Sequence, residues 1–252
     1  MAKPSSGSQE PAKKKRTKLQ MKKSSKGLTK AEQREKSQEQ ILDAAEELFS
    51  KYGLYGVTIK SVAEAVGVHT SLLHYYFEDK QGLFDRVIAR RAPETIERRM
   101  KALEKYEKEA GGAPTVEGAL HAFLDTDLEL YISGGEGWRN FGALAGQVNN
   151  APVWGAETMS KFDEVVLKLI DLLKKAMPDA AEEDIFWGYQ FVTGALTHTL
   201  ARTGRIDRLS KGLCRSDDFD AVKARMASFM AGGFIMSCEN RAAARKAQGL
   251  DA

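Results

Sequence analysis

Residues 58–84 read TIKSVAEAVGVHTSLLHYYFEDKQGLF, and their spacing predicts two short helices joined by a tight turn. Thr58 can cap the first helix, whose apolar residues recur at helical spacing from Ile59 to Val66. Gly67 follows the last of them and can adopt the left-handed conformation that turns the chain without a Cβ penalty. The pattern therefore predicts a helix-turn-helix.

The second helix of this motif is expected to have two different sides. Leu73 and Phe77, four residues apart, are predicted to face the first helix. The outer side carries hydroxyl, imidazole and phenol groups, which suit the major groove of DNA because base edges there present hydrogen-bond donors and acceptors. These outer residues are His69, Thr70, Ser71, Leu72 and Tyr75.

The same segment carries a family signature. The run TIKSVA at 58–63 and the run YYF at 75–77 stand in register with a glycine between them and with Lys80, Leu83 and Phe84 after them. This combination resembles the DNA-binding signature of the tetracycline-repressor (TetR) family of transcriptional regulators. The signature covers residues 37–87, and the rest of the chain is similar to the family in length and helical pattern only.

The resemblance implies a homodimer that binds a palindromic operator in double-stranded DNA. It also implies that the last two long helices form the dimer interface. His69, Ser71 and His74 differ from the residues usual in the family, which leaves the base preference open. Phosphate contacts are implied for Thr58, Lys60, Tyr76 and Lys80, base contacts for Thr70, Ser71, Leu72 and Tyr75, and either role for His69.

The distribution of charge separates the N-terminus from the remainder. The chain has 252 residues and a formal net charge of +3, but residues 1–36 hold 12 Lys and Arg against 3 Asp and Glu. With so few apolar residues this segment cannot offset its ordering entropy, so we expect a disordered basic arm. It is either an arm that contacts DNA or a solvated, solubilising run.

Apolar residues at helical spacing, with no alternation typical of strands, predict an all-α fold. Ser37 is expected to cap the first helix, Asp79 to begin a long one, Asp179 to cap another, and residues 219–233 to form the last good helix. We expect a basic arm at 1–36, a helix-turn-helix domain at 37–84, a ligand-binding and dimerisation bundle at 85–240 and a frayed tail at 241–252.

The large aromatic residues of the second half lie beside Gly-rich and Asn-rich breaks, which leave helices imperfectly packed and favour a ligand pocket. Core packing is the alternative for any one of them. The predicted lining is Trp138, Phe141, Trp154, Phe162, Phe186, Tyr189 and His198.

The last two long helices carry apolar or small residues on more than one side, including Gly188, Gly194, Gly232 and Gly233. A helix with two apolar faces needs a second partner, which favours a homodimer over packing within one subunit.

Several other classes of protein lack support in the sequence. Cys214 and Cys238 stand alone, which argues against a zinc site or a disulfide framework and fits a reducing cytoplasm. No apolar run is long enough for a membrane helix. Phosphate-binding Gly-rich loops and the common hydrolase motifs are missing, so no catalytic residue, cofactor or metal is expected.

The sequence thus predicts a repressor released from its operator by a small, largely apolar ligand. An activator or a ligand-independent DNA binder remains an alternative, as does an enzyme that uses the bundle pocket.

Overall fold

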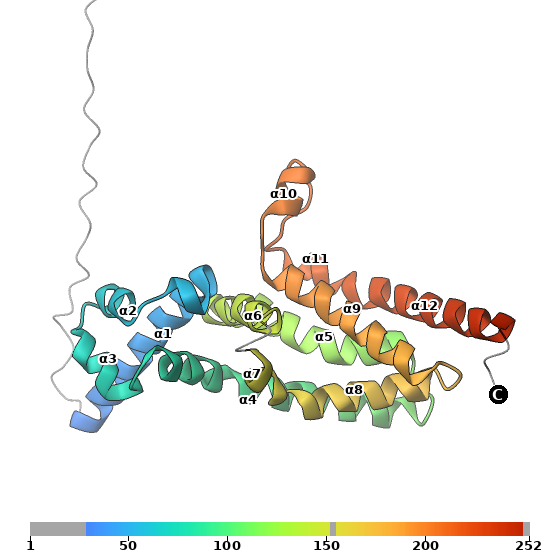
Figure 1. Cartoon of the computed structure of the whole chain (residues 1–252), viewed down its shortest axis with the longest axis horizontal. Helices are drawn as coiled ribbons and strands as arrows, with labels where there is room; N and C mark the ends of the chain where they lie inside the picture. The colour runs from blue at the N-terminus through green and yellow to red at the C-terminus, as the bar shows by residue number, and fades with distance from the viewer. Residues whose placement is uncertain (1–28, 152–154, 249–252) are drawn as a thin grey trace, which may run out of the picture. The chain divides into compact units, whose positions relative to one another are not determined.

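The computed structural model describes residues 29–151 and 155–248, and all regular elements in these ranges are helices, as the all-α prediction requires (Figure 1). The side chains of residues 152–157 lie outside the description. None of the helices in the described ranges has the length and apolar character needed to cross a membrane.

The first three helices form a small head. They are α1 (Lys30–Gly56), α2 (Ile59–Val66) and α3 (Thr70–Phe77). α1 begins before Ser37, the predicted cap, because Thr29 and Glu32 cap it instead: the Thr29 amide donates to Glu32 Oε2 at 2.6 Å. Residues 30–36 are therefore helical rather than part of a disordered arm, and residues 1–28 lie outside the described residues.

α1 is kinked at Gly53, which has φ of 69° inside the helix. A Cβ at this position would lie 3.1 Å from the side-chain oxygen of Gln147, so both backbone conformation and space favour glycine.

The turn between α2 and α3 forms as the sequence predicts. The Ser61 amide donates to Thr58 Oγ1 at 3.0 Å and the Thr58 amide donates to Ser61 Oγ at 3.0 Å, which is a reciprocal capping box. Gly67 takes the left-handed conformation with φ of 78°. Leu73 and Phe77 are buried against the head, so the helix-turn-helix is confirmed.

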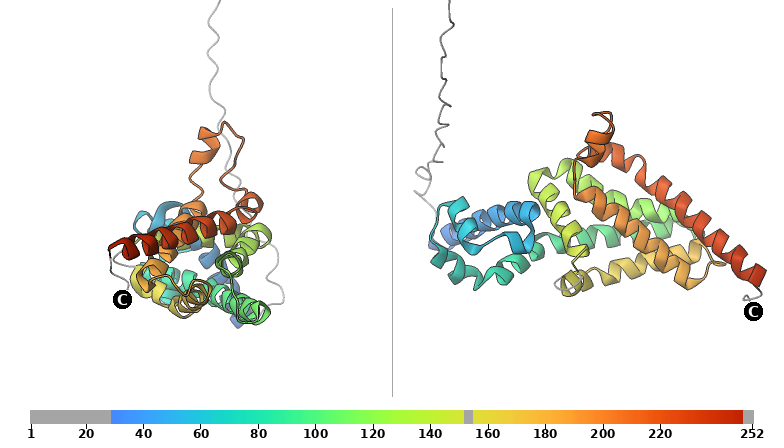
Figure 2. Two further views of the ribbon diagram at one scale, coloured as in Figure 1. Left: turned by 90° about the vertical axis from the view of Figure 1, so that its right-hand side faces the viewer. Right: turned by 45° about the horizontal axis from the view of Figure 1, so that its top comes forward.

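Among the remaining helices α5 is central: it contacts α4, α6, α8, α11 and α12, and α9 and α12 also pack against each other (Figure 2). The long helix predicted from Asp79 is α4, and the Asp79 carboxylate caps it by accepting from the Gly82 amide at 2.8 Å. The bounds are α4 Lys80–Ala110, α5 Val116–Ser133, α6 Gly135–Asn149, α7 Gly155–Ser160, α8 Asp163–Ala176, α9 Glu182–Leu200, α10 Arg205–Leu209, α11 Phe219–Lys223 and α12 Met226–Gln248.

Three expectations for the C-terminal half are wrong. Asp179 does not cap α9, whose N-cap is Ala181. The last predicted helix is divided into α11 and α12. The segment expected to fray from residue 241 stays helical to Gln248, because the Arg245 guanidinium donates to the buried Asp184 carboxylate at 2.6 Å and ties the end of α12 to α9.

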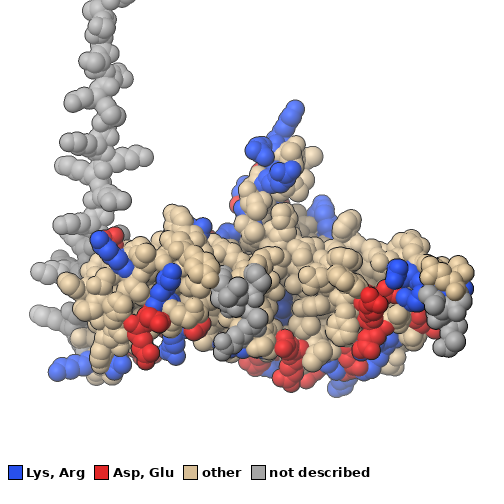
Figure 3. Space-filling model, viewed as in Figure 1, with Lys and Arg blue, Asp and Glu red and all other residues tan. Residues whose placement is uncertain are grey.

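The connection between α9 and α11 carries α10, which stands away from the other helices (Figures 1 and 2). α10 contributes no buried side chain, and Leu209 and Leu213 in this segment are 65% and 87% exposed. Basic side chains gather at its tip (Figure 3); the segment includes Arg205, Arg208 and Lys211.

Candidate functional site

The outer side of α3 presents part of the predicted base-reading set to solvent. His69, Ser71 and Tyr75 are exposed, and Tyr75 is 69% exposed. Thr70 is half-buried, and Leu72 is half-buried and packs against the core of the head. The capping of α2 and the burial of Leu73 and Phe77 fix this helix, so its first turn and Tyr75 form one outward surface.

The predicted phosphate-contacting residues flank that surface. The Thr58 hydroxyl accepts the cap bond from Ser61 and keeps its own O–H to donate. Lys60 is exposed, with its Nζ 3.9 Å from Glu64, a weak surface pair. Tyr76 is half-buried against the core of the head.

Lys80 lies beside an aromatic ring that the sequence did not single out. Its ammonium is 5.8 Å from the ring centroid of Tyr55, which is 75% exposed. Tyr55 lies in the last residues of α1, after the Gly53 kink, where the apolar periodicity of the helix has ended and could not mark it in advance. Tyr55 thus joins the candidate DNA-facing surface.

A cavity of about 50 Å³ lies in the bundle among α4, α5, α6, α7, α8 and α9. Phe141, Phe162 and Tyr189 line it, as predicted. Trp138 is buried beside it, edge-on to Phe141 with ring centroids 5.9 Å apart. The surface of the cavity is mostly apolar, and its apolar lining also includes Ile88, Phe123, Val148, Met159, Val166, Leu196 and Leu200. Asn149, Thr158, Thr193 and Thr197 are polar residues that line it as well.

Three predicted lining residues do not line the cavity, and Trp138, which packs on Phe141, is one of them. His198 lies on the opposite side of α9 from the lining residues, whereas Phe186 shares their face but lies nearly one turn before Tyr189, beyond the end of the cavity. Phe186 is 42% exposed and lies 5.7 Å from the Lys174 ammonium. Trp154, the remaining member of the set, lies outside the described residues.

One wall of the cavity is polar. Arg99 of α4 donates from Nη2 to Asp127 Oδ2 of α5 at 2.5 Å, and both side chains are buried. Thr95 and Tyr131 also line this wall. In the part of the chain that the structure describes, Arg99 Nε, Asp127 Oδ1 and Thr95 Oγ1 are buried without a hydrogen-bond partner. We name Thr95, Arg99, Asp127 and Tyr131 the polar wall.

Burial dominates the electrostatics of the polar wall. It raises the pKa of Asp127, and the neighbouring Arg99 and, to a smaller extent, the Tyr131 hydroxyl oppose this rise. Burial likewise raises the pKa of Tyr131 well above its usual range, helped by the Asp127 charge. The Arg99 guanidinium lies 4.1 Å from the ring centroid of Phe123, a cation–π contact that partly replaces its lost hydration.

Sequence reasoning missed the polar wall, although a signal was present. Asp127 stands at the helical spacing of Leu120, Leu124 and Tyr131, which are buried on α5. Arg99 holds the corresponding inward register on α4. A charged residue at a position where helical spacing predicts a buried apolar residue indicates a buried ion pair.

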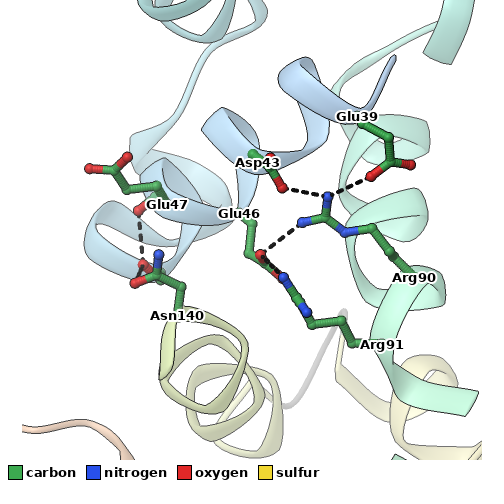
Figure 4. Close-up of polar contacts among 8 residues, drawn as sticks. Glu39, Asp43, Glu46, Glu47, Arg90, Arg91 and Asn140 are labelled. Carbon is green, nitrogen blue, oxygen red and sulfur yellow. Dashed lines mark hydrogen bonds and ion pairs between the residues drawn. The ribbon is translucent and has the colours of Figure 1, made fainter. Parts of the chain in front are cut away.

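The cavity and the head share α4. On this helix, Arg91 donates from Nε to Glu46 Oε1 at 2.6 Å and from Nη2 to Oε2 at 3.0 Å (Figure 4). Arg90 donates to the same Glu46 carboxylate at 2.7 Å. Glu46 is 1% exposed. Burial alone would lower the pKa of the Arg90 guanidinium. The neighbouring carboxylates, of which Glu46 has the largest effect, outweigh burial and raise this pKa.

A second connection to the head comes from α6, which also lines the cavity. The Ser50 hydroxyl donates to Asn140 Oδ1 at 3.3 Å, and the Gln147 side-chain amide donates to the Ser50 carbonyl at 2.7 Å. α1 is therefore held by α4 and α6, two of the helices that line the cavity.

The described residues hold no group of three or more His, Cys, Asp or Glu side chains that could bind a metal ion. The structure brings together a helix-turn-helix, a mostly apolar cavity and a polar junction between them.

Comparison with known proteins agrees with this arrangement. The family model for bacterial regulatory proteins of the tetR family matches residues 41–87, and that for the tetracyclin repressor-like C-terminal domain matches residues 121–233. The HTH-type transcriptional regulator BetI of Cronobacter sakazakii is 27% identical over 107 residues, 41% of this chain and 50% of that protein. The chain therefore matches about half the length of this relative.

A solved structure shares the fold. A TetR-like transcriptional regulator from Rhodococcus sp. RHA1 is similar with a TM-score of 0.51 and 19% identity, covering 79% of this chain and 96% of that one. The TetR family regulator PfmR from Thermus thermophilus has a TM-score of 0.49 and 19% identity, covering 75% and 97%. With a helix-turn-helix at 41–87 and the family's C-terminal domain at 121–233, the chain belongs to the TetR family of transcriptional regulators.

Proposed function

We propose that the protein is a repressor that binds a palindromic operator as a homodimer and is released from it by a small, largely apolar ligand. The observation that carries this proposal is the position of α4. This helix lines the cavity with Thr95 and Arg99 and holds the head through Arg90 and Arg91. A ligand that displaces α4 changes the position of the head.

The size of the cavity supports a mechanical release. Its volume of about 50 Å³ suits a few water molecules, whereas sites for small organic ligands span roughly 300–1,000 Å³. An effector must therefore push the lining helices apart. Pro93 lies in α4 between Arg91 and Thr95, and its missing N–H weakens the helix there. We expect α4 to bend at this residue when the cavity fills.

For DNA binding, we propose that the outward surface of α3 enters the major groove. Thr70, Ser71 and Tyr75 would contact base edges, and Leu72 would meet a thymine methyl group with its exposed part. His69 would contact either bases or phosphates. Thr58, Lys60, Tyr76 and Lys80 would bind phosphates, and Tyr55 would add a neighbouring contact.

For the homodimer, we propose the outer faces of α9 and α12. Trp187 and Phe191 of α9 are 54% and 58% exposed and stack with ring centroids 6.1 Å apart. Phe229 of α12 is 78% exposed. Such a cluster is unusual on a monomer and fits a self-complementary two-fold contact. Gly194 and Gly232, at which an added Cβ would meet no described atom within 4 Å, would let two helices approach closely.

The test maps the genomic sites bound by the protein and measures transcription of the adjacent genes with and without the regulator. A palindromic site and increased transcription in the absence of the regulator are expected. Reduced transcription in its absence would make the protein an activator. Failure of the purified protein to bind any enriched site would overturn the DNA-binding assignment of α3.

A further inference from the structure

We propose, resting on the effector function proposed for the cavity, that the effector bears an uncharged group that both donates and accepts hydrogen bonds, an amide or a hydroxyl, and that this group binds the polar wall. The rest of the effector is apolar and lies against the aromatic and aliphatic lining.

The polar wall has buried hydrogen-bond donors and acceptors without a partner, and these atoms suit an amide or a hydroxyl group. Arg99 Nε is a donor, Asp127 Oδ1 is an acceptor and the Thr95 hydroxyl is both. All three residues line the cavity and are less than a tenth exposed. Buried polar atoms are nearly always hydrogen-bonded in proteins, because leaving them unpaired is costly. A ligand group with a donor beside an acceptor would satisfy both sides of the ion pair at once.

The charge of the polar wall selects against ions. Arg99 and Asp127 already neutralise each other through the 2.5 Å contact. A carboxylate ligand would approach Arg99 but face the Asp127 carboxylate, and an ammonium ligand would approach Asp127 but face Arg99. Each would also lose its hydration in a mostly apolar cavity without gaining a net counter-charge. An amide or hydroxyl loses far less.

The experiment measures binding of octanamide, octanol, octanoate, octylamine and octane to the full-length protein by isothermal titration calorimetry. Because hydrogen bonds to charged groups contribute roughly 1.5–3 kcal/mol, octanamide or octanol should bind about tenfold or more tightly than the other three. Circular dichroism and operator binding without added compound show that the wild type and the variants described below are folded.

Variants separate this proposal from a purely structural role for the ion pair. Asp127→Asn keeps the shape of the side chain but leaves Arg99 uncompensated, so octanoate should become the tightest binder of the series. Thr193→Val is the matched control, because Thr193 lines the same cavity from α9 and has no place in the polar wall. It should keep the wild-type order.

Three results would overturn the inference: octane or octanoate binding the wild type as tightly as octanamide, no detectable binding of any compound, or an unchanged order in Asp127→Asn. Failure of the proposed function is a different result, in which octanamide binds the polar wall as expected but leaves operator affinity unchanged.

Discussion

The Glu46 carboxylate and the Arg91 guanidinium meet through two hydrogen bonds, 2.6 Å and 3.0 Å long, with Glu46 almost fully buried. This fork-like contact has both a fixed distance and a fixed orientation, unlike a single surface ion pair. It is the most directional link between the helix that begins the head and the helix that lines the cavity.

Replacing this carboxylate should uncouple the two parts. Glu46→Gln removes the charge but keeps the shape, and leaves Arg90 and Arg91 with weaker acceptors. We expect a loss of about 1–3 kcal/mol in the free energy of unfolding and a smaller effect of effector on operator affinity. Denaturant titration measures the free energy of unfolding, and operator binding with and without effector measures the effect of the effector. Glu47→Gln, the exposed neighbour paired with Lys51, is the control and should change neither.

Base reading and phosphate binding should separate in variants of the head. Tyr75→Ala should weaken binding to the operator by about 1–3 kcal/mol and leave binding to random DNA almost unchanged. Lys60→Ala should weaken binding to both duplexes and reduce the slope of log affinity against log salt by about one unit. Titrations of both duplexes at several salt concentrations distinguish them. Equal losses on both duplexes for Tyr75→Ala would remove it from the base-reading set.

Substitution of two glycines on α9 should affect two different properties, dimerisation at Gly194 and stability of the single chain at Gly188. At Gly194 an added Cβ meets no described atom within 4 Å, so Gly194→Trp should keep the chain folded but prevent dimerisation and tight binding to a two-half-site operator. At Gly188 a Cβ would lie 2.3 Å from the Phe234 ring, so Gly188→Ala should lower the stability of the chain itself, by about 1–3 kcal/mol. Sedimentation and thermal unfolding report the two effects. A Gly194→Trp protein that sediments as a dimer would place the interface elsewhere.

The stability of the bundle should depend on acid through Glu107. Hydrogen bonds from Lys168 at 2.6 Å and Lys175 at 2.8 Å lower the pKa of this carboxylate from 4.5 to about 2. Because the folded pKa lies below the unfolded one, the contribution is present above about pH 4.5 and is lost as the pH falls toward 2. The excess stability of wild type over Glu107→Gln should therefore shrink across this window in denaturant titrations. Glu104→Gln, which removes an exposed carboxylate from the same helix, is the matched control.

The basic N-terminus should affect affinity more than specificity. Deleting residues 1–27 removes all nine Lys and Arg residues before α1 but keeps Thr29, which caps it. If the arm follows the DNA backbone, deletion should weaken binding to operator and random duplexes alike and reduce the salt slope by several units. Dimerisation and effector binding should be unchanged. Identical salt slopes for the two proteins would identify the segment as a solubilising run.

Local signals predicted the head well and the cavity only in part. Thr58, Gly67, Leu73 and Phe77 act through contacts within one or two turns, so their residue types alone specify the turn. How far the cavity extends along α9 depends instead on partners far along the chain. Phe186 was therefore placed in the cavity and lies outside it, while Asp127 was overlooked because its partner, Arg99, is on another helix.

The position of α10 and its flanking loops affects how a protease cuts the folded chain. The helix buries no side chain, so cutting there would remove no part of the core. Arg205, Arg208 and Lys211 are exposed trypsin targets in this segment. Brief digestion of the folded protein that lacks residues 1–27 should therefore yield two fragments that remain associated, because α9 and α12 pack against each other on either side of the cut.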